Sequence, residues 1–132
     1  MKKIFSLLLL IVSLSFFTQI HAQQKAGWKE MDEFHKVMAA TFHPSEEGKL
    51  EPIKNQSGDL VKKAVSWQKS NAPEGYNKNA AKASLKKLVT ASKELHQLVK
   101  NNAADEVLKE KLSSLHDIFH EITEKCEKEK NM

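Results

Sequence analysis

Apolar residues recur at spacings of three and four along most of the chain from residue 27 onwards. This spacing is typical of helices that bury one face. It predicts helices over about 27–42, 50–70, 79–100 and 105–128. The positions expected in the core are Trp28, Met31, Phe34, Met38 and Phe42; Leu50, Ile53, Ser57, Leu60, Ala64 and Trp67; Leu85, Leu88, Ser92, Leu95 and Val99; and Leu108, Leu112, Leu115, Phe119, Ile122 and Cys126.

The segments between these series are short and contain residues that end or cap helices. Pro44 and Gly48 follow the first series, Pro73 and Gly75 follow the second, and "NNAAD" separates the last two. Four amphipathic helices with short connections pack naturally as an up-down-up-down antiparallel four-helix bundle. We therefore predict an all-α protein with this fold. Pro52 is compatible with it only near the start of the second helix.

The first 22 residues have the features of an export signal. Two lysines precede the apolar run "IFSLLLLIVSLSFF", which is too short for a resident membrane span, and "TQIHA" ends in a small residue suited to cleavage. We expect residues 1–22 to be a signal peptide and residues 23–132 to form one domain. The mature protein is then periplasmic or secreted, with no membrane association after cleavage.

Charge adds little to this picture. The chain has 21 basic and 17 acidic residues, and all the basic ones are lysine. Lysines alternate with acids along the expected helices, which is typical of solvated faces. Because the chain has no arginine, no guanidinium group can form paired hydrogen bonds with a phosphate or a guanine base. We therefore expect no nucleic-acid partner.

Cys126 is the only cysteine, so an internal disulfide cannot form. Its place in the apolar series predicts a small buried side chain. A free thiol in an oxidising compartment could instead join two chains as a homodimer, or bind metal.

The histidines provide the candidate chemistry. In an up-down-up-down bundle the first and fourth helices are antiparallel neighbours, which brings His35 to within about one or two turns of His116 and His120. The last two are four residues apart, a spacing that allows one ion to bind both. Imidazoles favour zinc, copper or nickel over calcium or magnesium. The sequence therefore predicts a transition-metal site at His35, His116 and His120.

Other residues could support this site. Asp32 and Asp117 each precede a histidine by three positions and could bind the metal or orient an imidazole. His43, near Glu46 and Glu47, could form a metal site at the helix end, although helix capping is the alternative. His96 has no evident partner and is expected to be structural. Incidental, solvated histidines remain the alternative to the whole site.

The sequence lacks the residues that two kinds of catalytic site require. A di-iron carboxylate centre needs acids on all four inward faces, but the second and third helices have none there. The chain also lacks a nucleophile with its base and a pair of catalytic carboxylates. We do not expect an enzyme.

The order of features resembles the cytochrome c-prime family and its b-type relatives. The resemblance rests on the signal peptide, the aromatic and methionine residues of the first helix, the proline and glycine links, and the ending "FHEITEKCEKEK". The family's Cys-x-x-Cys-His motif would begin at Cys126, but Glu129 and Lys130 occupy its later positions, which excludes the usual covalent haem. The resemblance implies non-covalent haem b as an alternative cofactor, held by Met31 or Met38 together with His116 or His120, and a role in electron transfer.

Three functions follow as expectations. The first is a metal-binding module that uses the histidines of the first and fourth helices. The second is a haem-binding protein that transfers electrons. The third is a structural or partner-binding bundle with no cofactor.

Overall fold

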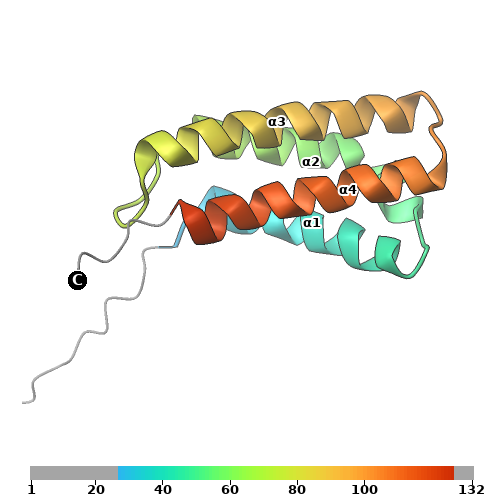
Figure 1. The fold of residues 1–132 in the computed structure, drawn as a ribbon, viewed down its shortest axis with the longest axis horizontal. Coiled ribbons are helices and arrows are strands. Elements are labelled where there is room, and N and C mark those ends of the chain that lie inside the picture. Colours follow the sequence, from blue (N-terminus) through green and yellow to red (C-terminus); the bar gives the residue numbers. More distant parts are fainter. Residues whose placement is uncertain (1–26, 127–132) are drawn as a thin grey trace, which may run out of the picture.

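A computed structural model describes residues 27–126 of the chain, so the signal peptide expected at 1–22 lies outside the described residues. The described part is formed by four helices, α1 (Lys29–Glu46), α2 (Glu51–Lys69), α3 (Lys78–Lys100) and α4 (Asp105–His120). Each helix runs antiparallel to the next, and α4 closes the bundle against both α3 and α1 (Figure 1). The predicted all-α fold and up-down connectivity are confirmed. Within residues 27–126, no helix has the length and apolar content needed to cross a membrane.

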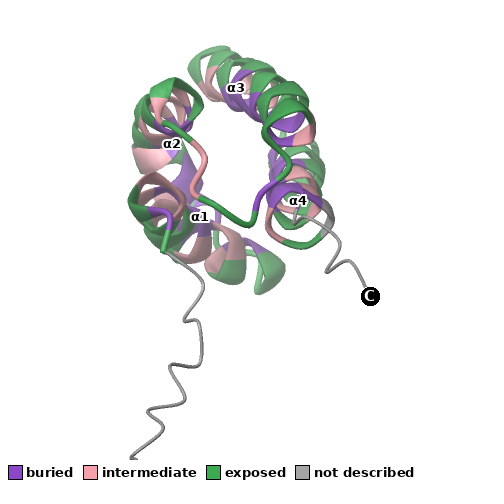
Figure 2. Cartoon of the chain, turned by 90° about the vertical axis from the view of Figure 1, so that its left-hand side faces the viewer, coloured by how far each residue is buried: buried purple, intermediate pink, exposed green. Residues whose placement is uncertain are grey.

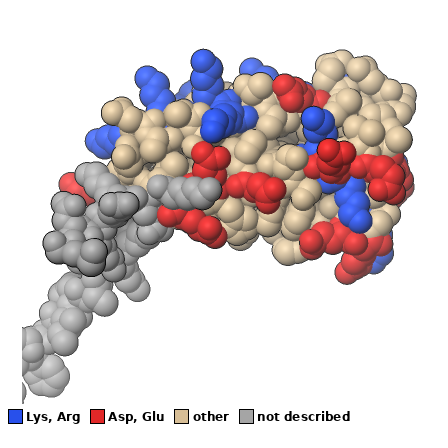
Figure 3. All heavy atoms as spheres, in the orientation of Figure 1, with Lys and Arg blue, Asp and Glu red and all other residues tan. Residues whose placement is uncertain are grey.

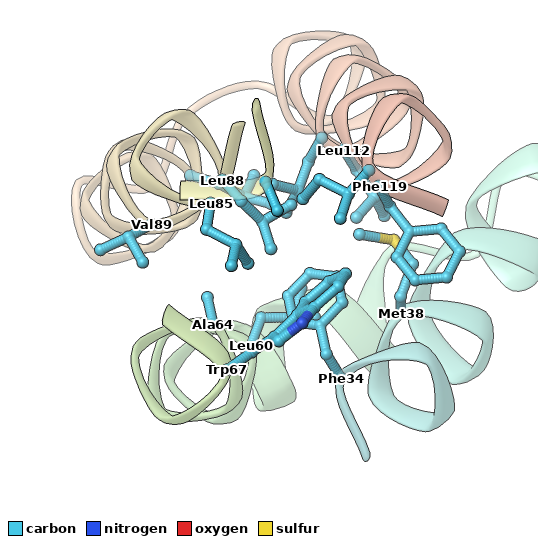
Figure 4. Close-up of a cluster of buried hydrophobic side chains, with 14 of the residues drawn as sticks. Phe34, Met38, Leu60, Ala64, Trp67, Leu85, Leu88, Val89, Leu112 and Phe119 are labelled. Carbon is cyan, nitrogen blue, oxygen red and sulfur yellow. The ribbon is translucent and has the colours of Figure 1, made fainter. Parts of the chain in front are cut away.

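One core runs along the bundle axis, and every helix contributes buried residues to it. Figure 2 colours these buried residues purple on each helix. Phe34 and Met38 of α1 meet Trp67 of α2 and Phe119 of α4 near the middle of the close-up in Figure 4. All the expected core positions of α2 and α4, together with Ile122 and Cys126, are buried. Met31, Phe42 and Val99 are only partly buried, because they lie near the edges of the contacts between helices.

The first helix is longer than the sequence suggests and continues through Pro44. Because α1 ends two residues later, the missing N–H of Pro44 removes only one backbone hydrogen bond. The helix stops where Gly48 adopts a φ of +81°. There the N–H of Lys49 donates to the carbonyl of Pro44 and that of Gly48 to Ser45, a helix ending that requires a left-handed residue.

The ends of α2 and α3 agree with their sequence signals. Pro52 lies in the first turn of α2, where its missing N–H removes no helical bond. The side chain of Asn77 caps α3 by accepting a hydrogen bond from the N–H of Ala80 at 3.1 Å. At the other end Asn102 has a φ of 52° and takes the left-handed position that glycine occupies after α1.

The fourth helix differs most from its prediction. Its α-helical part ends at His120, and residues Glu121–Lys125 form one turn of π-helix, labelled η1. Single π turns inside or beside α-helices often accompany functional positions. This one begins directly after the second histidine of the predicted metal site.

Candidate metal centre

His116 and His120 lie one turn apart at the end of α4, and their imidazoles converge. The two Nε2 atoms are 3.2 Å apart, and the ring centroids are 4.4 Å apart at 75°. One of these nitrogens must donate a proton to the other, because two bare nitrogens would repel each other at this distance. The spacing of four residues predicts that the two imidazoles lie close together. The structure shows that each ring turns its Nε2 atom toward the other ring.

Glu124 defines which nitrogen of His120 carries a proton. Its Oε1 lies 3.1 Å from the Nδ1 of His120. A carboxylate can only accept, so Nδ1 is the donor, and neutral His120 then has a bare Nε2 that accepts from His116. Glu124 lies in the π turn and was not among the residues predicted for the site. Its position four residues after His120 is the feature of the sequence that could have indicated the contact.

His116 is held from the opposite side by α1. Its ring lies flat against that of Phe42, with centroids 3.9 Å apart and an angle of 6° between the planes. Burial lowers the pKa of His116 below its ordinary value, and the neighbouring His120 lowers it further. Asp117 and Glu46 act in the opposite direction, but the net effect favours the neutral imidazole that binds metals.

Several charged groups surround this pair. The pKa of His116 responds to Glu46 and His43 at the end of α1 and to Asp117 beside it. His43 and Glu46 are both exposed, with Nδ1 and Oε2 3.8 Å apart. Among the described side chains, the groups that act on the pair are the carboxylates of Glu46, Asp117 and Glu124 and the imidazole of His43. A cation is therefore favoured here over an anion.

His35 does not join the pair as predicted. Its exposed imidazole is stacked on Phe119, with centroids 4.9 Å apart and planes at 11°. In the described part of the chain, no group of three or more His, Cys, Asp and Glu side chains is arranged to hold a metal ion. The three-histidine group expected from the sequence is thus not formed among the described residues. The ring of His35 packs on α4 through Phe119 instead.

The two aspartates and His43 have separate positions. Asp32 and Asp117 are both exposed, and Asp117 acts on His116 through its charge. The acid that contacts an imidazole of the pair is Glu124, a role that the sequence reading gave to Asp117. His43 lies in the last turn of α1, where its Nδ1 faces Oε2 of Glu46 at 3.8 Å.

His96 does have a partner, which the sequence reading did not find. Its Nδ1 lies 2.8 Å from the hydroxyl of buried Ser57, so it links α3 to α2. The imidazole also lies over Gly58 of α2, where an added β-carbon would be 3.5 Å from its Cε1. His96 is therefore structural, as expected.

The two methionines named for the haem alternative have different surroundings. Met38 is fully buried in the core, and the sulfur of Met31 accepts a hydrogen bond from the hydroxyl of Tyr76 at 3.8 Å. The methionines pack as apolar side chains.

Cys126 is buried and has its Sγ 3.9 Å from the hydroxyl of Ser84. Its carbonyl accepts a hydrogen bond from the N–H of Asn77, which fastens the π turn to the start of α3. The predicted small buried residue is confirmed. Glu129 and Lys130 lie outside the described residues.

Comparison with protein-family models, curated proteins and solved structures finds no match for this chain. The resemblance to four-helix cytochromes is therefore supported at the level of architecture alone. The chain is a four-helix all-α domain.

Proposed function

We propose that this protein binds a transition metal ion, such as zinc, copper or nickel, through His116 and His120. The observation that carries the proposal is the separation of 3.2 Å between their Nε2 atoms. A tetrahedral ion with bonds of about 2.05 Å to two imidazoles holds the nitrogens about 3.3 Å apart. The two nitrogens therefore already lie at about the separation that a shared ion requires. Binding at Nε2 of His116 requires the tautomer of this imidazole that has its proton on Nδ1.

The hydrogen bond to Glu124 supports the same role. Metal-bound histidines commonly donate their other ring N–H to a carboxylate, which fixes the tautomer and orients the ring. His120 has this arrangement before any ion is present. The depressed pKa of His116 also reduces competition from protons near neutral pH.

Two protein ligands leave coordination positions open. Water can fill them, and His43 and Glu46 are the nearest groups of α1 that act on His116. An accessible site with few protein ligands suits reversible uptake and transfer of an ion better than a permanent structural role. We propose a metal-binding or buffering module that is exported from the cytoplasm and is not an enzyme.

Elemental analysis of untagged protein from an exporting host tests the proposal, followed by calorimetric titration with zinc, copper and nickel. The His116→Ala and His120→Ala variants should lose the bound ion. His35→Ala and His96→Ala remove imidazoles elsewhere and serve as matched controls that should retain it. Equal retention by the wild type and the double variant His116→Ala/His120→Ala would refute the site. An equal loss in His35→Ala would instead restore the three-histidine arrangement predicted from the sequence.

A Glu124→Ala variant tests the orienting hydrogen bond separately. Loss of such a carboxylate typically weakens metal binding by about 10–100-fold. The matched control is Asp117→Ala, which removes a nearby negative charge without touching the hydrogen bond to His120. Equal effects in both variants would show that Glu124 acts through its charge alone.

A further inference from the structure

The charges of this protein are segregated between its two sides. α3 carries six lysines and one acid, whereas α4 carries four acids and two lysines. In Figure 3, lysines lie along the upper edge of the molecule over α3, and carboxylates gather over the lower half. The alternation of lysines and acids expected for every helix is therefore absent from α3.

Most lysines of α3 share one face. With 3.6 residues per turn, five of them fall within an arc of roughly 80° and span about 33 Å along the helix: Lys78, Lys82, Lys86, Lys93 and Lys100. The sixth, Lys87, lies toward α4, where its Nζ is 3.4 Å from Oε1 of Glu121. Among the described residues, Lys87 is the one lysine of α3 whose ammonium group has an ion-pair partner.

The lysine-bearing face of α3 borders α2. His96 lies on this side of α3 and packs over Gly58, where an added β-carbon would be 3.5 Å from its Cε1. Lys62 and Lys69 lie about one and three turns beyond Gly58, so they share the side of α2 that faces this contact. We call the surface formed by Lys62, Lys69 and the five α3 lysines the lysine seam. Asp59, 3.8 Å from Lys62, is an acid beside it.

One end of the lysine seam opens into a cavity of about 260 Å³. Lys78 and Lys82 line it together with the amide side chains of Gln68 and Asn71 and the indole of Trp28. Ammonium groups and amides together can bind a ring that carries hydroxyl groups and a negative charge.

We propose that the lysine seam binds a linear acidic polysaccharide, with its carboxylate or sulfate groups on the lysines and one sugar ring in the cavity. The narrow row of charges matches a chain better than a flat membrane. A membrane surface would also call for apolar anchors, and among the described residues the one exposed large hydrophobic side chain is Val107, on α4.

Single-stranded nucleic acid fits the seam less well. Its bases bind by stacking on exposed aromatic rings, but the indole in the cavity belongs to Trp28, which is only 2% exposed. The amides of Gln68 and Asn71 instead supply donors and acceptors for hydroxyl groups.

The test measures binding of the purified protein to polygalacturonate and heparin by calorimetry over a range of salt concentrations. Neutral dextran, oligothymidine and anionic lipid vesicles are the comparison probes. We expect binding to both acidic polysaccharides that weakens with salt. The triple variant Lys82→Ala/Lys86→Ala/Lys93→Ala should bind at least about tenfold more weakly and lower the salt slope by about one per contacting lysine.

The matched control is Lys36→Ala/Lys109→Ala/Lys111→Ala, which removes the same charge from α1 and α4. This control should bind as the wild type does, whereas equal weakening in both triple variants would show that net charge alone acts. A Gln68→Ala/Asn71→Ala variant should weaken polysaccharide binding and leave the salt slope unchanged. Tighter binding to oligothymidine or to vesicles than to either polysaccharide would overturn the assignment, as would no binding at low salt.

Discussion

The ring of Phe42 lies on the ring of His116 at 3.9 Å, almost parallel to it, and so fixes one half of the histidine pair from the neighbouring helix. Phe42 is the last apolar residue of the first series in the sequence. It is partly buried, and one side of its ring covers the imidazole of His116. A contact between α1 and α4 thus places one imidazole of the proposed metal site.

Removal of this contact should change the acidity of His116. In a Phe42→Ala variant the imidazole gains water, so the desolvation that lowers its pKa weakens and the pKa should rise toward its ordinary value. Titration of the His116 ring by NMR measures the change. A Phe42→Leu variant retains apolar cover and should show a smaller rise. An unchanged pKa in Phe42→Ala would place the cause of the shift elsewhere.

The stability of the fold should fall at acidic pH through the same histidine. Because the folded-state pKa of His116 is lowered, the unfolded chain binds this proton more readily than the folded one. The stabilisation is fully present above the unfolded pKa of about 6.5 and is lost as the pH falls through the lower folded pKa. Urea unfolding at pH 7.5 and at lower pH should show a smaller loss in His116→Gln than in the wild type. An equal loss in both proteins would contradict the linkage.

Gly58 should tolerate a methyl group. It lies inside α2, where glycine costs roughly 0.5–1 kcal/mol relative to alanine. The nearest atom to an added β-carbon is Cε1 of His96 at 3.5 Å, an ordinary van der Waals distance. Gly58→Ala should therefore raise the free energy of unfolding by about this amount in chemical denaturation. Gly58→Val adds bulk toward the same imidazole and should not give the gain. Destabilisation by alanine would mean that the helices cannot accept any side chain there.

Ser70 satisfies a buried indole. The Nε1 of Trp28 donates to its hydroxyl at 2.7 Å, and Trp28 is only 2% exposed. Ser70→Ala leaves this donor without its acceptor, which should lower the free energy of unfolding by about 1–3 kcal/mol. Ser66→Ala, at an exposed position of the same helix, should have little effect. Equal unfolding midpoints for the wild type and Ser70→Ala would show that water replaces the hydroxyl at no cost.

Much of the fold could be predicted because it depends on local patterns. The fourth apolar series gave six core positions, from Leu108 to Cys126, and all are buried. The π turn at Glu121–Lys125 could not be predicted in this way, because the spacing of Phe119, Ile122 and Cys126 is compatible with a continuous α-helix. The length of α1 was also missed, since a proline close to the end of a helix costs only one hydrogen bond.

The candidate site likewise contains one feature that depends on local spacing and one that depends on tertiary packing. The convergence of His116 and His120 follows from a spacing of four residues on one helix, so the sequence was sufficient to predict it. The position of His35 depends on the relative rotation of α1 and α4. That rotation is decided by ring contacts such as those between His35 and Phe119, which no spacing within one helix encodes.

The amino-acid sequence by itself determined four amphipathic helices, their order, their apolar faces and the histidine pair, because each depends on neighbours within a few residues. Only the tertiary structure decided that Glu124 contacts His120 and that Phe42 covers His116. It also decided that lysines of α2 and α3 lie side by side and form the lysine seam. These relationships depend on how helices rotate against each other and on a local change in helical pitch. Both are set by packing between side chains distant in sequence.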